Sequence, residues 1–187
     1  MIAIARWLAA RFLTTARTST EELPSTARLH VPRSVVTTLR EITRPTPRCV
    51  EPLALLRARY ASEGSRNVVV GVGTIPFPET AYVPGPAGAN FDTDWLVGIA
   101  NREIGANVGL LLVHSHGGRG TPGFSSVDRR TNAHVMAPLA IGINTAPYGA
   151  MVLSGDGANA VVTLDGILTP AEVIPVMDRL AGSEARG

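Results

Sequence analysis

An uninterrupted apolar run, "VGLLLV" at residues 108–113, constrains the fold more than any other part of the sequence. Successive side chains of a strand point to opposite faces of the sheet, so a strand that is apolar at every position must be covered on both faces. We therefore expect a central strand with other structure packed on each side. The run ends in His114 and His116, which a glycine-rich loop follows.

Residue patterning predicts the other elements of the chain. Runs of β-branched and apolar residues between turn residues predict strands, and apolar residues at helical spacing behind a capping residue predict helices. We expect strands at 49–62, 67–75, 140–143, 149–154 and 160–164. We expect helices at 31–42, 92–105, 125–139 and 169–182, the last because Thr169, Pro170 and Glu172 match a capping box.

These elements predict one α+β domain with helical additions at both ends. A length of 187 residues, of which 45% are hydrophobic, is enough for a single sizeable core. Residues 1–26 contain arginines spaced along an apolar segment and are expected to form an N-terminal amphipathic helix and a joint. Residues 27–187 are expected to form the domain proper, including a C-terminal helix.

Composition argues against several classes of partner. The net charge is only +2 and the basic residues are scattered, so we expect no nucleic-acid binding. No apolar run approaches the roughly 20 residues that cross a bilayer, which makes a membrane role unexpected. The single cysteine, Cys49, fits a reducing compartment, and we expect a cytoplasmic protein.

The residues after the apolar run have the spacing of a metal site. His114 and His116 are two apart in a strand and so share one face, and Asp128 lies one helical turn after Ser125 beyond the glycine-rich loop. Two imidazoles and one carboxylate leave a fourth position open, as in catalytic zinc sites. We expect one zinc per chain, bound by His114, His116 and Asp128, and hydrolysis at such a site also needs a nearby general base.

The pattern His-x-His, glycine-rich loop, Ser-x-x-Asp resembles the signature of the JAMM (JAB/MPN+) zinc metalloproteases, over roughly residues 29–166. The resemblance implies that Glu51 is the catalytic acid and base and that Ser125 stabilises the oxyanion. It also implies the MPN/JAB fold, a mixed, curved β-sheet flanked by helices and similar to that of the cytidine deaminases. Glu41, Glu63 and Glu79 remain alternative bases.

The same resemblance implies a bacterial, deubiquitinase-like metallopeptidase or isopeptidase. Its substrate would be the amide bond after the C-terminal tail of a ubiquitin-like protein or its conjugate, and activating (E1-like) or conjugating (E2-like) enzymes would be further partners. Two alternatives stay open: a processing peptidase for a sulfur-carrier protein, and a catalytically silent MPN scaffold. A simpler interpretation also remains, in which the histidines are polar residues at a strand end and Ser125 and Asp128 only cap a helix.

Overall fold

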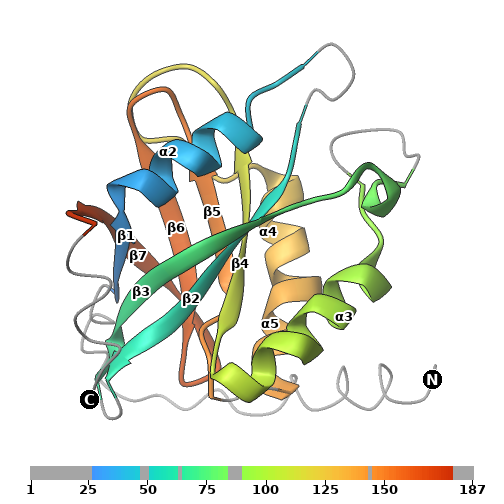
Figure 1. Cartoon of the computed structure of the whole chain (residues 1–187), viewed down its shortest axis with the longest axis vertical. Coiled ribbons are helices and arrows are strands. Elements are labelled where there is room, and N and C mark those ends of the chain that lie inside the picture. Colours follow the sequence, from blue (N-terminus) through green and yellow to red (C-terminus); the bar gives the residue numbers. More distant parts are fainter. Residues whose placement is uncertain (1–26, 47–50, 63–64, 84–89, 143–144, 179–187) are drawn as a thin grey trace.

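The computed structural model describes residues 27–46, 51–62, 65–83, 90–142 and 145–178 (Figure 1). The helix expected within residues 1–26, Cys49 and Glu63 lie outside these ranges. The strands are β1 (Ala27–Pro32), β2 (Ala54–Ser62), β3 (Ser65–Pro76), β4 (Gly109–Ser115), β5 (Gly149–Leu153), β6 (Ala158–Leu164) and β7 (Ile167–Val176). The α-helices are α2 (Arg33–Ile42), α3 (Thr93–Glu103), α4 (Ser126–Thr131) and α5 (Ala137–Gly142). Short 3₁₀ turns lie at Glu79–Ala81 and Ile104–Ala106, and a π-helical turn at Asn132–Met136 joins α4 to α5.

The strands of the described chain form a closed mixed barrel in the order β1-β3-β2-β4-β5-β6-β7. Parallel pairing of β1 with β7, from Ala27 opposite Ala171 to Pro32 opposite Val176, closes it. The expected MPN/JAB architecture, a curved α+β sheet flanked by helices, was therefore wrong. A sheet that closes on itself has no open edge, and its interior is a core of its own.

The helix expected at 169–182 and the strand expected at 140–143 were also wrong. Residues 169–176 belong to β7, where Thr169 and Ala171 point inward and Pro170 and Glu172 are exposed. This alternation is the period of a strand, and pairing with both β1 and β6 outweighs the local capping signal at Thr169. The strand expected at 140–143 is not one, because Ala140 to Gly142 complete α5.

Two apolar clusters explain why the central strand is apolar throughout. Leu111 and Val113 of β4 face the barrel interior together with residues of the other strands and of α2. Leu110 and Leu112 face the opposite side, where α3 and α5 cover the barrel. Figure 1 shows these helices along one side of the barrel and α2 beside one end. The expectation that β4 is covered on both faces is confirmed.

The described helices are short. None of them has the length and apolar character that spanning a membrane would need.

Candidate metal centre

The two histidines lie at the end of β4, on its outer face. By strand alternation His114 shares this face with Leu110 and Leu112, whose side chains pack under the helices. His114 is buried, with 6% of its surface exposed, whereas His116 is exposed just beyond the strand. The backbone N–H of His116 donates to the carbonyl of Leu153 on β5 at 3.0 Å, which fixes the chain where β4 ends.

The third candidate ligand is positioned by the start of α4. Ser125 is the N-cap of this helix, and its Oγ accepts a hydrogen bond from the backbone N–H of Asp128 at 3.2 Å. The backbone N–H of Ser125 in turn donates to Oδ2 of Asp128 at 2.6 Å, completing a capping box. The cap expected from the sequence is therefore present, and it also holds the carboxylate of Asp128 toward the histidines.

The glycine-rich loop is fastened to the turn between β5 and β6. Gly118 and Gly120 adopt left-handed backbone angles, φ 70° and 78°, which glycine tolerates best. The carbonyl of Gly118 accepts from the N–H of Gly155 at 2.9 Å, and the carbonyl of Gly120 accepts from Ser154 Oγ at 2.6 Å. The N–H of Gly120 donates to Asp156 Oδ1 at 2.6 Å. We call this set of contacts the loop clamp.

The three candidate ligands converge on one point. Nε2 of His114 lies 3.0 Å from Nε2 of His116 and 3.1 Å from Oδ1 of Asp128, and Nε2 of His116 lies 3.3 Å from Oδ2 of Asp128. A tetrahedral zinc with bonds of about 2.0–2.1 Å holds its ligand atoms ~3.3 Å apart. The spacing and the donor types of this group therefore suit a zinc ion, and the three residues form a group able to hold a metal.

Ionisation favours metal binding as well. Burial lowers the pKa of His114, and repulsion from His116 adds to this, although Asp128 and Glu51 act in the opposite direction. Burial by itself would raise the pKa of Asp128, but the hydrogen bonds from Ser125 and the neighbouring histidines together lower it. At neutral pH the site therefore presents a neutral imidazole at His114 and a carboxylate at Asp128, the forms that bind metal ions.

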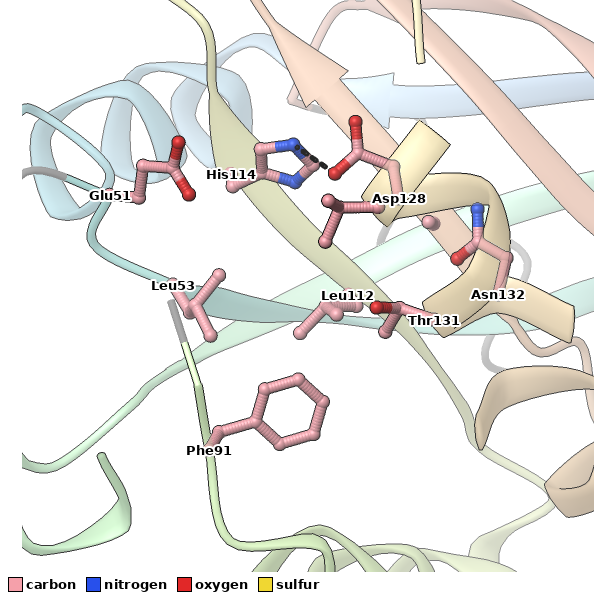
Figure 2. Close-up of a pocket in the computed structure, with 10 residues that line it drawn as sticks. Glu51, Leu53, Phe91, Leu112, His114, Asp128, Thr131 and Asn132 are labelled. Carbon is pink, nitrogen blue, oxygen red and sulfur yellow. Dashed lines mark ion pairs between the residues drawn. The ribbon is translucent and has the colours of Figure 1, made fainter. Parts of the chain in front are cut away.

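A pocket opens beside this group (Figure 2). Glu51 and the apolar side chains of Leu53 and Leu112 line it together with His114 and Asp128. Glu51 precedes β2 rather than lying within a strand, because β2 begins at Ala54. Figure 2 shows Glu51 and Asp128 on either side of His114, so the predicted base faces the same pocket as the predicted ligands.

The remaining predicted site residues lie elsewhere. Ser125 is exposed and does not line the pocket; its side chain and backbone N–H form the helix cap with Asp128. Glu41 is exposed on α2 and Glu79 is exposed on a 3₁₀ turn, and neither lines the pocket. Among the described residues, Glu51 is thus the glutamate that the pocket contains.

Thr131, Asn132 and Phe91 are among the residues of the pocket that were not predicted from the sequence. Thr131 and Asn132 follow Asp128 by three and four positions, a spacing that places them on its side of the helix and could have revealed them. Phe91 belongs to the segment after β3, and no local pattern connects it with the histidines. It stacks edge-on against Phe77, with ring centroids 5.6 Å apart.

Comparisons with known proteins give little beyond this geometry. No protein-family model matches the chain, and no curated protein matches it. The solution structure of protein DSY2949 from Desulfitobacterium hafniense is similar with a TM-score of 0.49 and 13% sequence identity, covering 82% of this chain and 97% of that chain. We draw no functional conclusion from a likeness of this extent.

Proposed function

We propose that the protein is a zinc-dependent metallopeptidase that hydrolyses the amide bond after the C-terminal tail of a ubiquitin-like protein. The observation that carries the proposal is the convergence of His114, His116 and Asp128, with Glu51 at the same pocket. The peptide substrate and the ubiquitin-like class rest on the resemblance of the His-x-His and Ser-x-x-Asp pattern to the JAMM metalloproteases.

The side chains divide the work of hydrolysis between them. His114, His116 and Asp128 would hold the zinc, which would supply a Lewis acid and lower the pKa of water at the site to near neutral. Glu51 accepts the proton that the attacking water loses and passes it to the leaving amine. The oxyanion role of Ser125 rests on the resemblance alone, because this residue does not line the pocket; its Oγ accepts a hydrogen bond in the helix cap, which leaves the hydroxyl hydrogen available to donate.

The test combines metal content with cleavage. Elemental analysis of zinc, iron and manganese is needed because two histidines and a carboxylate also form the ligand set of non-haem iron enzymes. We expect about one zinc per chain in the wild type. We also expect the zinc-loaded protein to cleave a ubiquitin-like protein that carries a C-terminal extension. A sulfur-carrier protein with such an extension is assayed in parallel to separate the two substrate classes.

His116→Ala and His134→Ala form a matched pair for this test. Both histidines are exposed, but His134 lies on the π-helical turn outside the group of ligands. We expect His116→Ala to lose zinc and cleavage and His134→Ala to keep both. Full zinc content in His116→Ala would contradict the site, and a zinc-loaded wild type that cleaves neither fusion would contradict the activity.

A further inference from the structure

We infer that Asn132 and the apolar wall beside it form a substrate subsite, in which the Asn132 carboxamide hydrogen-bonds the peptide backbone next to an aliphatic residue. This inference rests on the proposed function, because it assigns the part of the substrate that lies beside the metal ligands. It starts from the surroundings of Asn132 and from the chemistry of the pocket that this residue lines.

The side chain of Asn132 is almost wholly buried, but its carboxamide is open to the pocket. Only 4% of the residue is exposed, yet its amide atoms are not among the buried, unpaired side-chain atoms of the described residues, which are Arg40 Nε and Tyr148 Oη. Buried polar groups in folded proteins are almost always hydrogen-bonded, since burying an amide without a partner costs free energy. A side chain that lines the pocket in this state has its hydrogen-bonding capacity available for a ligand.

The backbone at Asn132 is unusual in the same place. The α-helical path of α4 ends at Thr131, and Asn132–Met136 forms a π-helical turn in which the N–H of Ala137 bonds to the carbonyl of Asn132. Such turns are rare and occur frequently at functional sites. Figure 2 shows Thr131 and Asn132 one turn beyond Asp128 along this helix, so the metal ligand and the carboxamide come from one continuous element.

The rest of the pocket defines the ligand. Apart from Thr131, the rest of its wall is apolar and is made by Leu53, Phe91, Leu112, Val127 and Ala150. The ionisable residues that line it are the proposed ligands His114 and Asp128 and the proposed base Glu51. A carboxamide both donates and accepts hydrogen bonds, which matches the N–H and C=O of a peptide. A peptide that places an aliphatic side chain against the apolar wall and hydrogen-bonds its backbone amide to Asn132 would therefore match both the apolar and the polar part of the pocket.

The experiment measures peptide binding separately from cleavage. The receptor is the full chain with zinc and the Glu51→Gln change, which we expect to slow cleavage enough for binding to be measured. The probes are fluorescein-labelled tetrapeptides that differ at one position, with Gly, Ala, Leu, Asp or Lys there. We expect the Leu peptide to bind most tightly, and Asn132→Ala to weaken its binding by about 10-fold, the loss of one buried hydrogen bond.

Two further variants and one spectrum keep the test independent of folding. Asn132→Asp preserves the shape but replaces the donating amide by a charge, so we expect it to weaken binding as well. Asn101→Ala, at an exposed position of α3, is the control and should leave binding unchanged. In the receptor without an Asn132 change, the NMR signals of the Asn132 side-chain amide should shift when the Leu peptide is added.

Each outcome decides either the subsite or the activity. Unchanged binding in both Asn132 variants, no preference among the peptides, or an unshifted Asn132 amide would overturn the subsite, whether or not fusions are cleaved. Peptide binding that depends on Asn132, in a protein whose wild type cleaves no fusion, would support the subsite and overturn the proposed peptidase. Zinc content is measured in every variant to check that the metal group is unaffected.

Discussion

At the residue scale, Glu51 separates catalysis from structure. We expect Glu51→Gln to keep zinc and fold but to lower single-turnover cleavage by about 10²–10⁴-fold, the usual contribution of general acid–base catalysis. The reason is that Glu51 lines the pocket without belonging to the group of metal ligands. Glu41→Gln on the exposed face of α2 is the matched control and should cleave normally. Near-normal cleavage by zinc-loaded Glu51→Gln would remove this residue from the mechanism.

Tyr148 allows a prediction about stability. Its side chain is fully buried, and its hydroxyl has no hydrogen-bond partner among the described residues. Tyr148→Phe removes this hydroxyl and leaves the ring in the core, so we expect the free energy of unfolding at pH 7 to rise by about 1 kcal/mol. Urea unfolding measures the change, and a loss of stability would show that the hydroxyl is bonded in the folded protein.

The same residue predicts a pH dependence. Burial, with a smaller contribution from Glu103, raises the pKa of Tyr148 to about 12 from its ordinary 10.0. Between these values the unfolded chain loses the proton and the folded chain keeps it, so stability falls as the pH rises. Each pKa unit corresponds to 1.36 kcal/mol, which gives a loss of roughly 2–3 kcal/mol. The wild type should lose this stability relative to Tyr148→Phe, and parallel curves for the two proteins would contradict the shift.

At the scale of elements, the loop clamp joins two parts of the chain that the candidate ligands depend on. A Cβ atom on Gly157 would overlap the carbonyl oxygen of Gly120, so Gly157→Ala must push the glycine-rich loop away from the turn between β5 and β6. This loop connects His116 to the helix that carries Asp128. We expect zinc affinity to fall by about 10-fold or more, as when groups that orient metal ligands are lost. Competition with a chelator of known affinity measures this change.

Gly98→Ala is the control for that substitution. Gly98 lies within α3, and a Cβ added there meets no atom within 4 Å. Alanine is the better helix former by roughly 0.5–1 kcal/mol, so this variant should be more stable and bind zinc normally. If Gly157→Ala also binds zinc normally, the loop keeps its ligands in place without the clamp.

Local patterns were sufficient to predict how the candidate ligands lie. The two-residue period of β4 places His114 and His116 together, and the capping box at Ser125 fixes Asp128, so contacts within a few residues determine most of the geometry. The loop clamp was not predictable in this way. It depends on the turn after β5, about 35 residues further along the chain, and no residue near His116 specifies that contact.

At the scale of the whole molecule, the prediction from the sequence was wrong for β7, whose pairing with β1 joins residues far apart in the chain. β7 carries a convincing local helix signal, yet its partner β1 lies 144 residues earlier, from Ala27 opposite Ala171. Local sequence patterns depend on residues a few positions apart and carry no information about a pairing between strands so far apart in the chain. A curved sheet followed by a helix was therefore expected in place of the barrel. In the structure the buried Thr169 and Ala171 alternate with the exposed Pro170 and Glu172 as a strand requires, whereas the capping-box pattern alone predicted a helix there.

Closure of the barrel can be tested by truncation. A chain that ends at Gly166 lacks β7, which leaves β1 and β6 with unpaired edges and opens the interior, so we expect loss of cooperative thermal unfolding and of zinc binding. A chain that ends at Asp178 keeps all the described strands and the 2.7 Å hydrogen bond from Ser34 Oγ to Asp178, and it should melt like the full chain. Circular dichroism melts and elemental analysis compare the two. Cooperative melting of the shorter chain at the full-length temperature would mean that β7 is an appendage, as a C-terminal helix would have been, and that the remaining strands are stable as an open sheet.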